Sequence, residues 1–142
     1  MSASTPSVTH RATRGCKAFD LAFVSGSTGA VPASFQRGRG VKSVSRLAAG
    51  KYKIFIERAG ADIVGFESWV EQASFALTGA CRGHIVDNHV ADAVPYFTIQ
   101  IVSGQSTNTD SGTTMGGPKA VDPTTGDVVK VKFEVKYSAG LA

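Results

Sequence analysis

The stretch VVKVKFEVKY, residues 128–137, alternates apolar and charged side chains along most of its length. Residues two apart on a β-strand point to the same face of the sheet, so this pattern predicts a strand with one buried and one solvent-facing side. The expected buried side carries Val129, Val131, Phe133, Val135 and Tyr137. The expected outer side carries Lys130, Lys132, Glu134 and Lys136.

A second strand is predicted at KYKIFIER, residues 51–58, with Tyr52, Ile54 and Ile56 on its inner face. Lys51, Lys53 and Phe55 fall on the opposite face. Lysines on the outer side of a strand discourage edge-to-edge association of sheets. Their regular placement indicates a scaffold and does not by itself suggest catalysis.

Shorter alternating runs at residues 19–23, 41–47 and 96–102 are bounded by Gly, Ser and Pro. The chain holds 16 glycines and only 18% charged residues, against about 25% in an average soluble protein. Short strands joined by turns are typical of all-β domains. We therefore expect an antiparallel β-sandwich, jelly-roll-like, with an extended N-terminal arm.

The middle of the chain, residues 61–83, permits two interpretations. The first is a pair of strands, Ile63–Val70 and Ala73–Ala80, with Val64, Phe66 and Val70 inward on one and Phe75 and Leu77 inward on the other. The second is an amphipathic helix with Ile63, Phe66 and Val70 on one face. Gly65 and the aromatic content favour strands. In the strand interpretation Trp69 faces away from Phe66 and Val70, either at an interface or as a cap on one end of the domain.

The domain organisation follows from the polar segments. Residues 1–17 are rich in Ser and Thr and have no periodicity, which predicts an extended basic arm. Residues 18–142 form the expected single domain, with a long polar loop at 103–127. The chain has neither an apolar run of membrane-spanning length nor the apolar core of a secretory signal, so we expect a soluble chain made in a cytoplasm.

Charge is divided unevenly along the chain. Residues 1–53 hold nine bases and one acid (+8), whereas residues 54–142 hold six bases and ten acids (−4). Either a basic arm or face meets an acidic partner, or the two halves interleave in space and the field cancels. Under the first interpretation, the candidate partner-binding residues are five bases and the outward tryptophan: Arg11, Arg14, Lys17, Arg37, Arg39 and Trp69.

The sequence offers little for catalysis or metal binding. Cys81 and His84 are the nearest approach to a zinc site, and no third ligand accompanies them. Glu67 and Glu71 would lie about 13 Å apart on a strand, too far for a retaining glycosidase. We expect no enzymatic activity, no cofactor and no metal, with His84 and His89 as loop histidines. Cys16 and Cys81 are read as ordinary thiols, and whether they pair stays open.

Two segments resemble small structural proteins of tailed bacteriophages. They are VKSVSRLAAGKYKIFIE, residues 41–57, and AVDPTTGDVVKVKFEVKYSA, residues 120–139. Proteins of that group decorate or cement icosahedral heads or form short head fibres, and their domains are jelly rolls or similar β-sandwiches. The resemblance implies the major capsid protein as partner, a dimer or trimer at a capsid symmetry axis, and no catalytic residues.

The leading hypothesis is therefore a structural virion protein on the capsid exterior, assembled in the host cytoplasm, that cements neighbouring major capsid subunits. The alternative is a carbohydrate- or receptor-binding module of a phage tail or tail tip, with Trp69, Tyr96 or the long loop at the sugar. A third and weaker option is a nucleic-acid-binding barrel, since the sequence pI is about 9.3. Only 8% of residues are aromatic and most Phe positions point inward, so nucleic acid and membrane are not expected partners.

Overall fold

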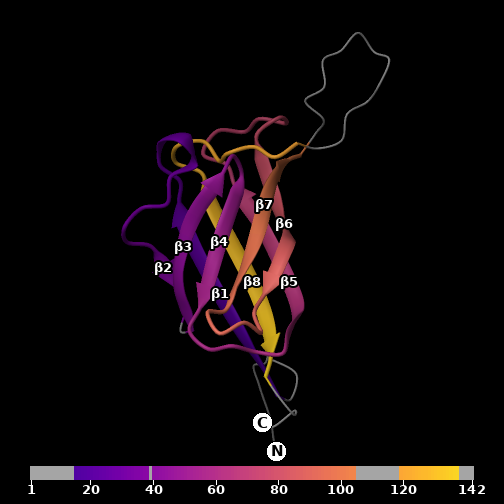
Figure 1. Ribbon diagram of the computed structural model, residues 1–142. Coiled ribbons are helices and arrows are strands. Elements are labelled where there is room, and N and C mark those ends of the chain that lie inside the picture. Colours follow the sequence, from indigo (N-terminus) through magenta and orange to yellow (C-terminus); the bar gives the residue numbers. More distant parts are fainter. Residues whose placement is uncertain (1–14, 39, 105–118, 138–142) are drawn as a thin grey trace, which may run out of the picture.

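The computed structural model describes residues 15–38, 40–104 and 119–137. Their strands form one antiparallel sheet in the order β2-β1-β8-β5-β6-β7-β4-β3. The strands are β1 (Cys16–Val24), β2 (Gln36–Arg37), β3 (Val41–Ala48), β4 (Lys51–Ile56), β5 (Asp62–Glu71), β6 (Ala80–His89), β7 (Tyr96–Ser103) and β8 (Val128–Lys136), with a single 3₁₀ turn η1 at Ser27–Gly29. The sheet curls into a half-barrel (Figure 1).

The predicted all-β antiparallel class is confirmed, but the two-sheet, jelly-roll-like sandwich is wrong. Each strand is hydrogen-bonded to its neighbour from β2 to β3, so the described strands form one sheet. The core is enclosed by the curvature of that sheet rather than by a second layer. Period-two alternation predicts that one face of each strand is buried, and it does not say which strands share a sheet.

The concave face holds the core. The predicted inner positions of β8 and β4 are all buried, and Phe133 packs its ring 4.8 Å from that of Phe97 and 5.3 Å from that of Phe19. On the β4 side, Phe23 lies 5.3 Å from Tyr52. Aromatic rings from β1, β4, β7 and β8 therefore meet inside the half-barrel and fix its curvature.

One short crossing brings the two edges of the sheet together. Gly38 N–H donates to the Asp20 carbonyl on β1, and Glu57 N–H donates to the Gly40 carbonyl near the start of β3. Gly40 has φ +98°, and a side chain there would collide with the Phe19 ring. Glycine at position 40 thus lets the chain pass tightly from one edge of the sheet to the other.

The middle of the chain forms strands and no helix, but the second predicted strand is displaced. Residues 72–79 are the loop between β5 and β6, and its Phe75 is 81% exposed. The Gln72 amide donates to the carbonyls of Ala76 and Ala80 and accepts from Ala76 N–H, so a side chain holds this loop. The alternation of Phe75 and Leu77 predicted a strand, but the hydrogen bonds of the Gln72 side chain hold this segment as a loop.

Val64 also departs from its predicted inward position. It is 49% exposed, because the register of β5 against β8 shifts between Ile63 and Gly65. Such a bulge adds one residue to a strand and turns its side chain to the other face. Phe66 and Val70, beyond the shift, pack against the core as predicted.

The predicted arm and long loop are described only in part. Strand β1 begins at Cys16, inside the segment expected as arm, and residues 1–14 lie outside the described residues. Of residues 103–127, Ser103 ends β7, Ala120 bridges to Val102, and positions 105–118 lie outside the description. Within the described ranges, no helix has the length and apolar character needed to cross a membrane.

Candidate functional site

A cluster of aromatic rings lies on the convex face of the sheet, where β4, β7 and β6 are neighbours. Phe55 pairs with Tyr96 across β4 and β7, and Tyr96 pairs with His89 across β7 and β6. The Phe55 and Tyr96 ring centroids are 5.6 Å apart. The His89 ring stacks on Tyr96 at 4.8 Å with an interplanar angle of 18°. The strand register thus places three rings in one row.

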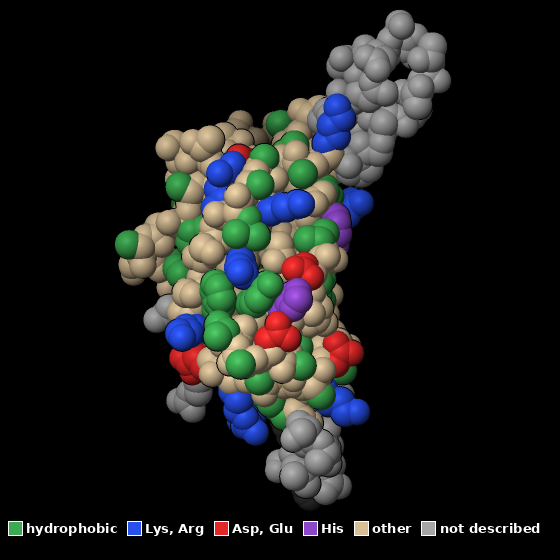
Figure 2. Space-filling model, viewed as in Figure 1, with side chains coloured by type: hydrophobic (Ala, Val, Ile, Leu, Met, Phe, Trp, Pro, Cys, Tyr) green, Lys and Arg blue, Asp and Glu red, His purple; other side chains and the backbone are tan. Residues whose placement is uncertain are grey.

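Charged groups surround this row. Lys53 Nζ lies 4.1 Å from the centroid of the Tyr96 ring and 5.2 Å from that of Phe55. Both nitrogens of His89 contact carboxylates: Nε2 is 2.9 Å from Asp87 and Nδ1 is 2.9 Å from Asp92. We call Lys53, Phe55, Asp87, His89, Asp92 and Tyr96 the Tyr96 patch. Figure 2 shows this face, with a histidine between two acidic groups and hydrophobic side chains beside it.

The carboxylates determine the charge of His89. Its hydrogen bond to Asp92 raises the pKa of the imidazole, desolvation opposes the increase, and the charges of Asp87 and Asp92 add to it. The protonated ring donates from both nitrogens, so the two ion pairs fix its orientation on Tyr96. The patch therefore presents a preorganised platform of aromatic and charged groups.

The chemistry of the Tyr96 patch suits binding to a macromolecular surface. Tyrosine and other aromatic residues are enriched at interfaces because they bury large areas at a small cost in side-chain entropy. Lys53 and the two aspartates supply complementary charge at the rim. The patch contains no hydroxyl or thiol paired with a base, which nucleophilic catalysis requires.

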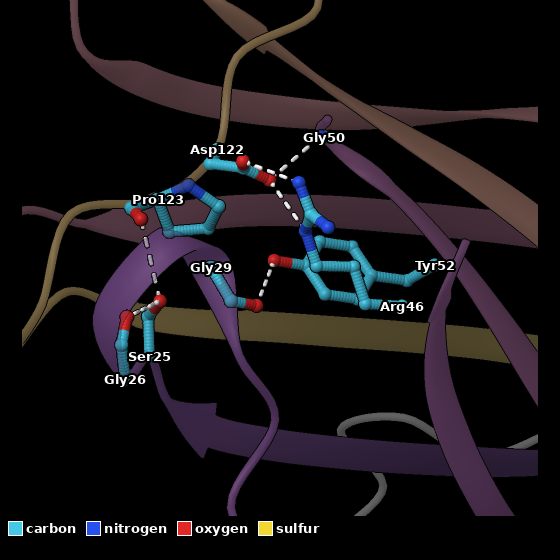
Figure 3. A network of polar contacts seen from close by, with 8 residues as sticks. All are labelled: Ser25, Gly26, Gly29, Arg46, Gly50, Tyr52, Asp122 and Pro123. Atoms are coloured by element: carbon cyan, nitrogen blue, oxygen red, sulfur yellow. Dashed lines mark hydrogen bonds and ion pairs between the residues drawn. The ribbon is translucent and has the colours of Figure 1, made fainter. Parts of the chain in front are cut away.

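A second polar cluster lies at the end of the half-barrel where the β3–β4 turn meets the segment before β8 (Figure 3). Arg46 donates from Nε and Nη2 to the two oxygens of Asp122, at 3.0 and 2.7 Å. Gly50 N–H donates to the same carboxylate at 2.8 Å, and the Tyr52 hydroxyl donates to the Gly29 carbonyl at 2.6 Å. We call Gly29, Arg46, Gly50, Tyr52 and Asp122 the Arg46 network.

The Arg46 network is built for structure. Burial raises the pKa of Tyr52 far above its ordinary value, so the hydroxyl stays a donor. Desolvation acts to raise the pKa of Asp122, but the hydrogen bonds from Arg46 and Gly50 and the charge of Arg46 outweigh it and lower that pKa. Ser25 adds bonds to the carbonyls of Gly26 and Pro123. These contacts join chain segments that are distant in sequence.

The structure separates the two predicted partner-binding residues whose side chains it describes. Lys17 pairs in register with buried Val135 and so belongs to the concave side, at one end of β1, where it is exposed. Trp69 pairs with Lys130 and Arg82 and lies on the convex face, half-buried. The backbone of Arg37 lies in β2 opposite Leu21, and Arg11, Arg14 and Arg39 lie outside the described residues.

The sheet order also bears on the charge asymmetry. Strands β1 to β4, from the basic first part of the chain, occupy the two edges of the sheet, and β5 to β8 occupy the centre. Each lysine of β4 therefore lies within one strand of residues from the more acidic part. Within the described residues the strands of the two parts therefore lie in separate blocks of the sheet, which meet at the β1–β8 and β4–β7 pairs.

Sequence reasoning missed most of the Tyr96 patch. His84 and His89 were expected in loops and both lie in β6. A signal for Tyr96 was present, since it is out of phase with the buried Phe97, Ile99 and Ile101. His89 could be placed beside it only from the pairing of β6 with β7, which joins residues 89 and 96 through the intervening turn.

Metal and thiol chemistry finds no site in the described ranges. No group of three His, Cys, Asp or Glu side chains there is arranged to hold a metal ion. Cys16 and Cys81 are both free thiols. Comparison with known proteins finds no matching family model, no matching curated relative and no matching solved structure.

Proposed function

We propose that this chain is a structural virion protein that binds the outer surface of a phage capsid and cements neighbouring major capsid subunits. The observation that carries the proposal is the Tyr96 patch, a row of three ordered rings on the outer face of a rigid sheet. The resemblance of residues 41–57 and 120–139 to phage head proteins supports the same role. The role is non-enzymatic and needs no cofactor.

The patch would provide the anchor of the interface. Phe55, Tyr96 and His89 are each half-buried in the free chain, so a partner can remove further ring surface from water. The ion pairs of His89 hold the platform before binding, which lowers the entropic cost of association. Its partner would offer an apolar depression bordered by acidic groups for Lys53.

Avidity would complete the attachment. In this proposal the protein self-associates as a dimer or trimer at a capsid symmetry axis, so that several weak contacts act together through effective concentration. Arg11 and Arg14 of the N-terminal segment, with Lys17, would add salt-sensitive contacts to an acidic shell. Such a protein would be found on the exterior of the virion after assembly in the host cytoplasm.

Rebinding to heads stripped of the protein tests the proposal. The double variant Phe55→Ser, Tyr96→Ser removes two rings of the patch and should lose most of the rebinding. Val24→Ser is the matched control. Val24 is an apolar residue with 54% of its surface exposed, and it lies on β1, near the edge of the sheet that is opposite to β4 in the strand order. Both variants are first compared with the wild type by circular dichroism and thermal unfolding.

Equal rebinding of the patch variant and the Val24 control would contradict the patch as the anchor. Absence of the protein from purified particles would overturn the cement role altogether. A chain lacking residues 1–14 should rebind more weakly, with a smaller dependence on salt, since β1 stays intact when the deletion stops before Cys16.

A further inference from the structure

A depression lies on the outer, convex face of the sheet, over β8 and between β1 and β5. Two adjoining cavities of about 390 and 220 Å³ share Asp20 and Lys132 in their walls. Ala18 and Gly65 flank Glu134 in register, and their small size leaves the depression between larger neighbours. We call this depression the β8 groove. Its size falls in the range of small-molecule sites.

Trp69 stands at one end of the β8 groove and is the only tryptophan of the chain. Its backbone is fixed by pairing with Lys130 on one side and Arg82 on the other. Lys132 Nζ lies 5.9 Å from its ring. A ring carried by a central strand offers a rigid, partly exposed apolar surface to a ligand.

The polar side chains of the groove are available to a ligand. Asp20, Lys132 and Glu67 face outward in one cross-strand row. Among the described residues no ion pair engages any of the three, although Lys130, next along β8, pairs with Glu71 at 2.8 Å. Carboxylates and an ammonium group of this kind can accept and donate hydrogen bonds in the same small space.

Charge selects the class of ligand. The row alternates acid, base, acid, and Glu134 adds a further carboxylate beside it. A polyanion such as single-stranded nucleic acid would place its phosphates against these carboxylates. A polycation would meet Lys130 and Lys132. A neutral ligand with many hydroxyl groups satisfies donors and acceptors together and can lay an apolar ring face on Trp69.

We propose that the β8 groove is a binding site for a neutral oligosaccharide, with Trp69 as the stacking surface and Asp20, Glu67 and Lys132 as hydrogen-bonding groups. This activity goes beyond the cement role. The groove uses β1, β8 and β5, whereas the Tyr96 patch uses β4, β7 and β6. A virion protein with both surfaces would hold the shell with one and a surface glycan with the other.

The fluorescence of Trp69 is a site-specific reporter, because no other tryptophan is present. The full chain is titrated with maltohexaose, cellohexaose and chitohexaose, and with a heparin hexasaccharide and oligothymidylate as anionic probes. At least one neutral hexasaccharide should change the emission in a saturable manner that is insensitive to salt. No saturable change with any of the three, or binding only of the anionic probes, would overturn the proposal.

Variants locate the site independently of fluorescence. By titration calorimetry, Trp69→Ala should abolish binding of the neutral hexasaccharide, and Glu67→Gln should weaken it about tenfold, the effect of losing one hydrogen bond to a charged group. Glu57→Gln, an equal change at an exposed glutamate outside the groove, should bind as the wild type does. Equal binding by the Trp69→Ala chain would contradict the groove as the site.

The two proposals fail separately. Glu67→Gln should rebind stripped heads normally, and the chain with Phe55→Ser and Tyr96→Ser should bind the hexasaccharide normally. Loss of hexasaccharide binding in the Phe55→Ser, Tyr96→Ser chain, with the fold retained, would contradict the assignment of the sugar to the β8 groove. Loss of head rebinding in the Glu67→Gln chain would contradict the separation of the two surfaces.

Discussion

The Arg46 network and the Tyr96 patch contain the same kinds of groups in opposite settings. The Arg46 network contains Tyr52 of β4, and the Tyr96 patch contains Tyr96 of the adjacent strand β7. Each region also holds a cation and at least one carboxylate. Tyr52 is fully buried and its hydroxyl donates to a backbone carbonyl. Tyr96 is half-buried, and its ring packs against Phe55 and His89, which are themselves partly exposed. Side chains that hydrogen-bond to the backbone, as in the Arg46 network, stabilise the fold. Side chains that contact one another on the exposed face, as in the Tyr96 patch, can also contact a partner.

Truncating the two tyrosines gives the largest expected difference. Tyr52→Ala should lower the free energy of unfolding by about 3–5 kcal/mol, because it empties a fully buried ring site and leaves the Gly29 carbonyl without its donor. Tyr96→Ala should lower it by about 1–2 kcal/mol, a smaller loss because the Tyr96 ring lies on the surface and is partly exposed already. Urea unfolding followed by circular dichroism measures both.

If Tyr52→Ala fails to fold, Tyr52→Phe keeps the comparison measurable. It removes only the hydroxyl and should cost about 1 kcal/mol, against no measurable change for Tyr96→Phe. Equal losses for the two phenylalanine variants would show that the patch contributes to stability as the network does.

The carboxylates of the two regions give the next effect. Asp122→Ala removes the acceptor of Gly50 N–H and the partner of Arg46, and we expect a loss of about 1–2 kcal/mol, reduced by the 20% exposure of the Asp122 side chain. Gly50 has φ +71° and its turn packs against the carbonyls of Ile101 and Val121, so the turn has no other conformation in which to recover the bond.

Asp92→Ala is the counterpart in the patch and should lower the free energy of unfolding by much less than Asp122→Ala, because the His89–Asp92 pair is exposed. A loss as large as that of Asp122→Ala would contradict the separation of the two regions into fold and interface. The same urea series, run at one pH, decides between these outcomes.

The sequence predicted the faces of strands better than their neighbours. The inner residues of β4 and β8 could be identified because burial at every second position is a property of one strand. That Asp122 meets Arg46, 76 residues away in the chain, depends on the order of strands in the sheet, which periodicity does not contain. The sandwich prediction failed for the same reason, because alternation is identical in one curled sheet and in two stacked ones.

The candidate sites show the same limit. Trp69 was placed on the outer face of its strand from phase alone, but its groove requires β1 to lie beyond β8. Phe55 was seen on the lysine face, yet nothing local indicated that β7 would place Tyr96 against it. Gln72 precedes the predicted strand Ala73–Ala80 and holds residues of that segment in a loop through side-chain hydrogen bonds that no hydrophobic pattern records.

The smallest expected effect is the pH response of His89, and it is the most specific test of the patch. The pKa of His89 is raised in the folded chain, so its ion pairs favour folding fully below the ordinary histidine pKa of 6.5. That contribution is lost as pH rises from 6.5 through the higher folded value, because the neutral ring no longer carries the charge that both aspartates attract. His89→Gln lacks the response, so the stability difference between wild type and variant should shrink as pH rises above the ordinary histidine pKa of 6.5. A proton NMR titration of the His89 ring should give a midpoint above 6.5, moved downward in Asp92→Asn, whose amide keeps the size of the side chain and removes its charge. A midpoint unchanged by Asp92→Asn would mean that the ring is not held between its two carboxylates in solution, and the preorganisation assigned to the patch would then be wrong.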